Sequence, residues 1–266
     1  MFSMRVAMKK DNKKIIYYDN ELEDEFSQAE ITPRRIDGSY KYLGGPLRGL
    51  GRGLLYYVVA KPLAYAFLKL KYGHKIVNKE CMKEAKKRGC FMYGNHTNAI
   101  ADALIPTMLT HPKGAYVIVH SNNVSMPVLG RITPCLGALP LPDDKEAGRN
   151  FNFAMDKLMR RGSNIAIYPE AHIWPYYTGI RNFGDASFRY PVKYKAPVYT
   201  FTNTYQRRIY RKTPRIVTYV DGPFYPEQSL SVKEQRLRLH RQAIESMKMN
   251  SRKSNIDIIK YVKRED

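Results

Sequence analysis

The chain has 266 residues, and its 45 lysines and arginines against 24 aspartates and glutamates give a formal net charge of +21. Hydrophobic residues make up 44% of the chain and aromatic residues 12%, which excludes a mostly disordered protein. Three cysteines without a CxxC pair exclude a disulfide framework and disfavour a zinc ribbon. The lack of a disulfide framework predicts a reducing compartment. Residues 1–14 are polar and basic, so we expect no signal peptide.

The positive charge lies in the body and the C-terminal part of the chain. Residues 1–45 carry eight basic and eight acidic side chains, whereas residues 46–206 carry 22 and nine, and residues 207–266 carry 15 and seven. A field of this sign attracts nucleic acid, anionic lipid headgroups or a phosphorylated substrate. Composition alone leaves these three classes of ligand open.

We expect residues 1–45 to form an extension on the surface of the protein. The segment that follows differs in its composition. Residues 46–72 are rich in apolar and aromatic side chains, but Lys61 and Pro62 interrupt them well short of the ~20 apolar residues that a spanning helix needs. Two short helices that meet at Pro62 fit this pattern. The flanking cations and tyrosines are typical of a segment in a membrane interface, and a buried helical hairpin of a soluble core is the alternative.

From residue 78 onward, strand patterns alternate with helical patterns. Strands are predicted over residues 90–93, 115–120, 137–141, 164–168, 197–205 and 215–220. Helices are predicted over residues 78–88, 99–109, 145–161, 185–194 and 231–247. The alternation predicts an α/β fold with a mixed, mostly parallel sheet flanked by helices, preceded by an N-terminal interfacial helical hairpin.

The same patterns predict four regions along the chain. They are an N-terminal extension (1–45), a membrane-interface helical segment (46–77), an α/β domain (78–226) and a basic C-terminal helical tail that packs on the domain (227–266).

The loop at residues 94–98, with the sequence GNHTN, follows a predicted strand and opens a predicted helix. Functional loops of α/β sheets lie at such carboxyl ends of strands. His96 stands in this loop, and Asp102 follows six residues later. A carboxylate bonded to one imidazole nitrogen leaves the other free to take a proton from a hydroxyl. No elbow-type Ser or Cys motif is nearby, which favours direct attack by a substrate hydroxyl. A helix N-terminus with an incidental histidine is the alternative.

Two further blocks follow the loop around His96. One is MPVLGR at residues 126–131, followed by LGALPL at 136–141, and the other is IAIYPEAH at 165–172, followed by APVY at 196–199. Taken together, these motifs resemble the four ordered blocks of the glycerolipid acyltransferase family. These PlsC-like enzymes acylate glycerol-3-phosphate or 1-acyl-sn-glycerol-3-phosphate (lysophosphatidic acid). The resemblance covers roughly residues 50–225.

The resemblance implies a role for each matched position. It implies that His96 is the catalytic base, that Asp102 is its partner, and that Pro197 belongs to a block that packs the acyl chain or acyl donor. Arg131 corresponds to the arginine that contacts the acceptor's phosphate. The residues implied to bind substrate are Asn95, Gly130, Arg131, Pro169, Glu170 and Arg181, and no metal ligand is implied.

Two features depart from the family pattern. The spacing of His96 and Asp102 is His-x5-Asp, one residue longer than usual, so their pairing requires that the loop at residues 97–99 absorbs the extra residue. The third block reads PEAHI and lacks the usual glycine and arginine. The candidates to replace that arginine are Arg181 or His172 and, with less support, Arg189 and Lys193.

The resemblance therefore predicts a membrane-associated acyltransferase, peripheral or monotopic at the cytoplasmic face of the cell membrane. It would transfer a fatty acyl group from acyl-CoA or acyl carrier protein (acyl-ACP) to the free hydroxyl of lysophosphatidic acid, giving phosphatidic acid. A thioester is already activated, so no cofactor or metal is expected. The expected partners are the two substrates and an anionic membrane surface, with acyl carrier protein as a further candidate.

Two alternatives remain open. One is a member of the same fold that acylates another lysolipid, or none, because the third block is altered. The other is a nucleic-acid-binding protein, which the charge favours but which the absence of helix-turn-helix, RNP-type and KH-type motifs disfavours. We therefore expect no nucleic-acid partner.

Overall fold

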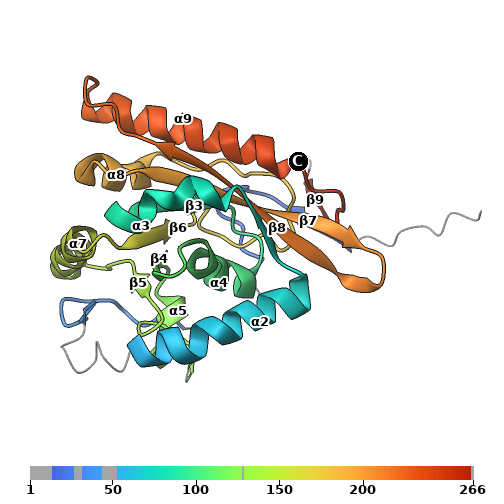
Figure 1. The fold of residues 1–266 in the computed structure, drawn as a ribbon, viewed down its shortest axis with the longest axis horizontal. Coiled ribbons are helices and arrows are strands. Elements are labelled where there is room, and N and C mark those ends of the chain that lie inside the picture. The colour runs from blue at the N-terminus through green and yellow to red at the C-terminus, as the bar shows by residue number, and fades with distance from the viewer. Residues whose placement is uncertain (1–13, 27–31, 44–52, 128, 265–266) are drawn as a thin grey trace, which may run out of the picture.

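A computed structural model describes residues 14–26, 32–43, 53–127 and 129–264 (Figure 1). The predicted segment at 46–72 lies partly outside these residues, because 44–52 are not described. Within the described ranges, no helix is both long and apolar enough to cross a membrane.

The main sheet has seven strands in the order β2-β8-β7-β3-β6-β4-β5. Their bounds are β2 Lys75–Val77, β3 Cys90–Gly94, β4 Ala115–Val119, β5 Ala138–Pro140, β6 Asn164–Ile167, β7 Val198–Arg208 and β8 Arg211–Phe224. Strands β7, β3, β6, β4 and β5 are parallel, whereas β8 runs antiparallel to β7 and carries β2 parallel to itself. The predicted fold class, a mixed and mostly parallel sheet flanked by helices, is therefore confirmed.

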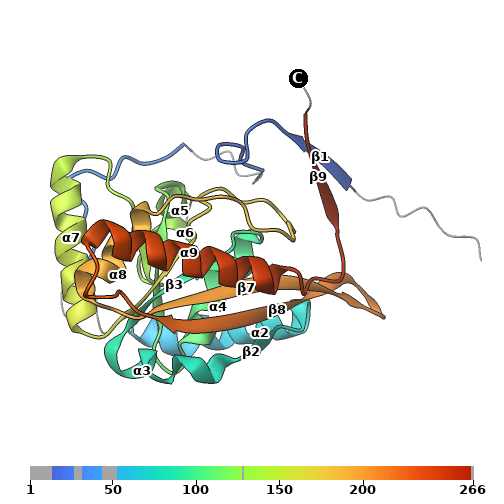
Figure 2. The same ribbon diagram turned by 90° about the horizontal axis from the view of Figure 1, so that it is seen from above.

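The helices cover both faces of the main sheet (Figures 1 and 2). Their bounds are α2 Lys61–Tyr72, α3 Ala85–Arg88, α4 Ala99–Leu109, α5 Asn122–Ser125, α6 Leu129–Ile132, α7 Lys145–Arg160, α8 Arg189–Tyr194 and α9 Val232–Ser251. Alternate residues of β3 enter opposite cores, with Phe91 and Tyr93 packing among α7, α8 and α9, and Cys90 and Met92 packing among α2 and α4. Burial on both faces explains the uninterrupted apolar sequence of this strand.

The segment around Pro62 differs from the predicted pair of helices. A π-helical stretch, η1 (Leu55–Ala60), continues directly into α2, so the described residues form one uninterrupted helical segment instead of a hairpin. Pro62 lies where η1 passes into α2, so its missing N–H leaves the continuous helix without one backbone donor, and the wider π-helical stretch directly precedes this position. The inward side of α2 buries Ala64, Leu68 and Tyr72.

The predicted helix over residues 78–88 is also different. It consists of a 3-10 turn, η2 (Lys79–Lys83), followed by the short α3. The predicted helix over 185–194 is likewise a 3-10 turn, η3 (Ala186–Phe188), joined to α8. The C-terminal helix α9 begins with a capping box between Ser231 and Glu234, and its buried side packs on the main sheet.

A second, two-stranded sheet joins segments from opposite parts of the chain. Strand β1 (Lys14–Tyr18) pairs in parallel with β9 (Ile259–Lys263), and Figure 2 shows the pair standing apart from the main sheet. Neither strand, nor β2, was predicted from the sequence. These strands are short and bear several charges, so they lack a strong alternating pattern.

Candidate active site

The loop that follows β3 brings His96 and Asp102 together. Helix α4 begins after Asn98, whose extended backbone and side-chain bond to the Ala101 N–H cap the helix. The residue that lengthens the motif therefore lies in the loop and adds no rotation within the helix. Nδ1 of His96 lies 2.9 Å from Oδ2 of Asp102.

Asp102 is 1% exposed, and its carboxylate is surrounded by donors. Oδ2 accepts the backbone N–H groups of Thr97 and Asn98, both at 2.8 Å, and Oδ1 accepts the side-chain amide of Asn203 at 3.1 Å. The first turn of α4 adds the favourable field of a helix N-terminus. A carboxylate held in this way accepts the Nδ1 proton of His96, which leaves Nε2 as the basic nitrogen of the ring.

The other side of the His96 ring is supported by Tyr168, which directly follows β6. The two rings stack with their centroids 4.6 Å apart, and the Tyr168 hydroxyl donates to the backbone carbonyl of Asp102. Burial raises the pKa of Tyr168 well above its usual range, so the hydroxyl stays protonated and remains a donor. His96 itself is 19% exposed, and within the described ranges Nε2 has no hydrogen-bond partner. The basic nitrogen is therefore available to a substrate.

Glu170 lies directly behind this loop and is buried. Its carboxylate accepts the backbone N–H of His96 at 3.2 Å and the side-chain Nη2 of Arg181, also at 3.2 Å. Burial raises the pKa of Glu170, and the Arg181 charge opposes that shift. The buried ion pair with Arg181 thus holds the Glu170 carboxylate in place, and the carboxylate in turn holds the backbone of the loop at His96.

Arg181 is fully buried, so it does not present its guanidinium to a substrate in this structure. The group lies 4.9 Å from the centre of the Trp174 ring and donates to the backbone carbonyls of His172 and Glu21. His172 is half-buried and faces Glu25. The two leading candidates for the missing arginine therefore contact the N-terminal segment, and their predicted role in acceptor binding stays a prediction.

Asn95, Pro169 and Pro197, which were also predicted from the sequence, lie in three separate places in the structure. The Asn95 side chain is buried and bonds both backbone groups of Asn203, at 3.0 and 2.8 Å, so it joins the end of β3 to β7. Pro169 lies in the turn after Tyr168. Pro197 precedes β7, at the opposite end of the sheet from His96, where its carbonyl accepts the N–H of Phe91.

The second block forms the short helix α6. A Cβ on Gly130 would lie 2.6 Å from the backbone oxygen of Val124, so only glycine fits there. The backbone of Arg131 is part of α6, and its side chain is outside what the structure describes. Gly130 also borders a cavity of about 830 Å³, whose wall includes Arg34, Tyr56 and Tyr116.

Asn203 was not predicted from the sequence, and among the described residues it is the side chain that donates to Oδ1 of Asp102. Asn203 in turn accepts the Thr218 hydroxyl at 2.7 Å, and Nε2 of His74 lies 2.9 Å from that hydroxyl. Because the Thr218 proton goes to Asn203, Nε2 of His74 is the donor. Burial lowers the pKa of His74 to about 4, which keeps its ring neutral. An asparagine between two threonines of β7 was the only signal in the sequence.

Ala171 occupies the position of the family's glycine in the third block. Its backbone has a φ of +62°, in the left-handed region that glycine favours. This chain therefore adopts a left-handed backbone at this position with a Cβ in place. Within the described ranges, no cluster of three His, Cys, Asp or Glu side chains is arranged to hold a metal ion.

Comparison with solved structures finds a similarity to the 1-acyl-sn-glycerophosphate (LPA) acyltransferase PlsC from Thermotoga maritima. The sequence identity is 16% and the TM-score is 0.49, and the match covers 79% of this chain and 96% of that chain. No protein-family model matches the chain, and no curated protein matches it. We therefore base the functional proposal on the site's own geometry.

Proposed function

We propose that the chain is an acyltransferase that moves a fatty acyl group from a thioester to the hydroxyl of a lysophospholipid, with His96 as the general base. The observation that carries the proposal is the buried Asp102 carboxylate on Nδ1 of His96, which leaves the accessible Nε2 as the basic nitrogen. Within the described ranges, no serine or cysteine side chain is bonded to His96. This arrangement favours direct attack by the acceptor over an acyl-enzyme intermediate.

The proposed acyl transfer needs only the two substrates and the His96 side chain. Nε2 of His96 takes the proton of the acceptor hydroxyl while the hydroxyl oxygen forms a bond to the thioester carbonyl carbon. The tetrahedral intermediate then collapses, the C–S bond breaks, and the proton passes to the leaving sulfur. The products are the ester and a free thiol. General-base assistance of this kind contributes about 10²–10⁴-fold to the rate.

For the substrates, we propose lysophosphatidic acid as acceptor and acyl-CoA or acyl-ACP as donor, so that the product is phosphatidic acid. Arg131 is the proposed ligand of the acceptor's phosphate, because a guanidinium binds phosphate through two hydrogen bonds and would orient the hydroxyl. Another lysolipid is the alternative acceptor. A panel of lysolipid acceptors, each with both donors, distinguishes these possibilities.

We also propose that the protein works at the surface of a membrane, at its cytoplasmic face. The outward side of the helical segment η1–α2 supports this location, because it exposes large apolar side chains, namely Leu54, Tyr57, Val58, Val59, Leu63, Tyr65 and Leu70. Lys69 and Lys71 lie in its last turn. Such a segment is suited to lie in the interface of an anionic bilayer.

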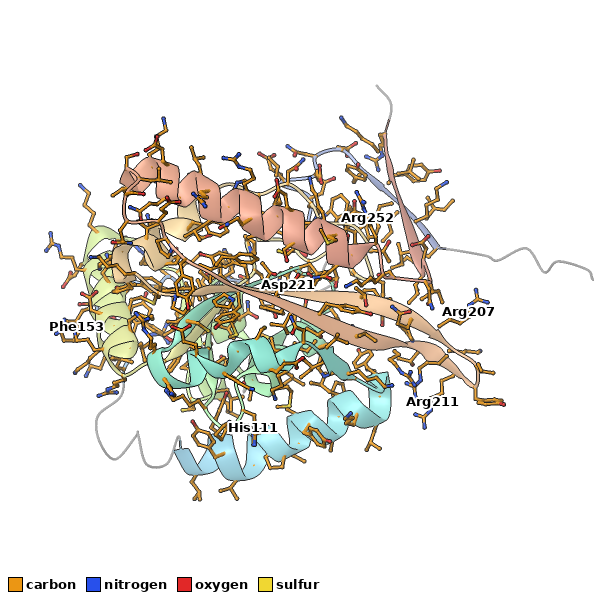
Figure 3. The ribbon with its side chains drawn as sticks, turned by 45° about the horizontal axis from the view of Figure 1, so that its top comes forward. His111, Phe153, Arg207, Arg211, Asp221 and Arg252 are labelled. Carbon is orange, nitrogen blue, oxygen red and sulfur yellow. The ribbon has the colours of Figure 1, made fainter. Side chains whose placement is uncertain are left out.

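The first prediction tests the base. We expect His96→Ala to lower kcat for acyl transfer at least ~100-fold, because the hydroxyl proton loses its acceptor. The assay is release of free thiol from acyl-CoA with lysophosphatidic acid in mixed micelles. His111→Ala is the matched control, because His111 is an exposed histidine in the turn before β4 (Figure 3), and we expect it to keep full activity.

Thermal melts followed by circular dichroism should show the same midpoint for the two variants. Full activity in a folded His96→Ala protein contradicts the mechanism. Salt-sensitive binding to DNA or RNA by an unaltered chain without transferase activity would instead favour the nucleic-acid alternative.

A further inference from the structure

The turn between β7 and β8 exposes two large apolar side chains. Ile209 and Tyr210 form the two-residue turn, and they are 89% and 95% exposed. Neither residue has the positive φ that would call for glycine or asparagine, so the turn selects no particular side chain. Turn geometry therefore does not account for isoleucine and tyrosine at the tip, and no core covers them.

Basic side chains surround this tip. Arg207 and Arg208 precede the two turn residues, and Arg211 and Lys212 follow them, as Figure 3 shows for the labelled Arg207 and Arg211. Within the described ranges, none of these four side chains forms an ion pair with a carboxylate. The tip thus combines exposed apolar surface with unneutralised positive charge.

The hairpin is fastened to the end of helix α2. Nη1 of Arg208 donates to the carbonyl of Lys71, and Nη1 of Arg211 donates to the carbonyl of Leu70, both at 2.9 Å. Cations at a helix C-terminus are favoured by the helix dipole. These bonds hold the tip beside Leu70, which is itself 70% exposed and belongs to the apolar side of α2.

The tip also has a defined relation to the candidate active site. Strand β7 is parallel to β3, with Phe201 opposite Gly94, so Arg208 at the carboxyl end of β7 and His96 just after β3 lie toward the same end of the sheet. A surface that receives the tip would therefore lie at the end of the sheet where His96 stands.

We propose that the Ile209–Tyr210 turn is a membrane-insertion point that enters the interface of an anionic bilayer beside α2. This inference deepens the membrane location in the proposed function and rests on it. Tyrosine prefers the headgroup level, isoleucine the adjoining acyl region, and the flanking cations lie at the depth of lipid phosphates. Insertion at this tip turns the His96 end of the sheet toward the membrane that holds an amphiphilic acceptor.

The test places a fluorescent side chain at the tip. Tyr210→Trp is mixed with vesicles of phosphatidylcholine and phosphatidylglycerol, with and without bromine on the acyl chains. We expect its emission to shift to shorter wavelength and to be quenched by the brominated lipid. Trp174, the only native tryptophan, is buried, so the unaltered chain gives the baseline. Tip emission that stays unshifted and unquenched, whether or not the protein binds vesicles, overturns the proposal.

Binding measurements test the two kinds of side chain separately. The double variant Ile209→Ser/Tyr210→Ser should bind the same vesicles about tenfold more weakly or worse. Arg207→Gln/Lys212→Gln should lose about thirtyfold, and only when phosphatidylglycerol is present. Phe153→Ser is the control, because Phe153 is an exposed apolar residue of α7 far from the tip (Figure 3).

Unchanged affinity of both double variants also overturns the proposal. Vesicle binding is read without acyl transfer, so its failure is distinct from a failure of the proposed reaction. Activity toward a short-chain acceptor below its micelle concentration tests that reaction alone, and we expect the tip variants to keep it.

Discussion

At the carboxylate of Asp102, four donors converge on two oxygens, and they come from two parts of the chain. His96, Thr97 and Asn98 belong to the same loop, whereas Asn203 reaches in from β7. A fully bonded carboxylate has one orientation, and it therefore sets the orientation of the imidazole. We interpret Asn203 as a residue that positions Asp102 without touching the substrate.

The effect of Asn203 is open to measurement. We expect Asn203→Ala to lower kcat about tenfold or more, because Oδ1 loses its donor and the carboxylate can turn away from His96. A less neutralised carboxylate also holds the imidazole proton more tightly, so the acid limb of kcat/KM should move to higher pH. The measurement is the pH profile of acyl transfer.

Thr202→Ala is the matched control for Asn203→Ala. Thr202 is the buried neighbour on the same strand, and its hydroxyl has no hydrogen-bond partner within the described ranges. We expect it to leave the pH profile in place. An Asn203→Ala profile that coincides with that of Thr202→Ala would show that Asn203 contributes only to folding.

At the scale of elements, the antiparallel edge of the sheet is tied to the site by polar groups. His74 directly precedes β2, and its bond to Thr218 of β8 continues through Asn203 of β7 to Asp102. Strands β7 and β8, the residue before β2 and the start of α4 therefore share one buried chain of hydrogen bonds. Such a chain is stable only while each member keeps the protonation state that its neighbour requires.

His74 gives this edge a pH dependence. Its pKa falls from the usual 6.5 to about 4 on burial, so the unfolded chain binds its proton more readily than the folded one. Its contribution is complete above pH 6.5 and is lost as the pH falls toward 4. We expect the free energy of unfolding to drop about 2–3 kcal/mol more in the unaltered chain than in His74→Gln between pH 7 and 4.5. Urea titrations at both pH values measure the difference, and equal drops would contradict it.

At the scale of the whole molecule, the N-terminal and C-terminal segments jointly cover the loop that carries Glu170 and Arg181. The Trp174 ring of this loop stacks on Tyr261 with centroids 4.8 Å apart and also contacts the ring of Tyr18. Its Nε1 donates to the backbone of the N-terminal segment at Asp24. The small sheet β1–β9 thus completes the packing behind the site.

Removal of β9 should loosen that cover and leave the main sheet intact. In a chain that ends at residue 258, Tyr261 no longer stacks on Trp174 and β1 loses its partner strand. We expect the emission maximum of Trp174 to move to longer wavelength as water reaches the ring. Far-ultraviolet circular dichroism should remain that of an α/β protein. Unchanged emission would show that the cover does not depend on β9.

The sequence was sufficient for most strands of the main sheet and for the contact between His96 and Asp102. Uninterrupted apolar strands such as Cys90–Gly94 and the amphipathic helix Lys145–Arg160 have strong local patterns, and they lie close to where they were predicted. His96 and Asp102 are six residues apart and are joined by one loop, so their contact could be predicted from the local sequence. In these cases, residues that are close together in the sequence were enough to predict the structure.

The rest depends on contacts between distant segments. Asn203 meets Asp102 only because β7 lies beside β3, and Arg181 is buried only because Trp174 and the N-terminal segment cover it. Strands β1 and β9 form a sheet only with each other, although most of the chain separates them in sequence. No local pattern encodes such pairings, because the sequence of each partner alone does not indicate which distant segment it contacts.

The parallel pairing of β1 with β9 has a consequence for biosynthesis. Strand β1 leaves the ribosome before every strand of the main sheet, and β9, its only strand partner among the described residues, emerges after them. During that interval β1 has an unpaired edge with two isoleucines and two tyrosines, the kind of segment that chaperones protect. The packing behind His96 is thus completed only once β9 has been released, so a nascent chain without β9 cannot yet hold the active-site loop as the folded protein does.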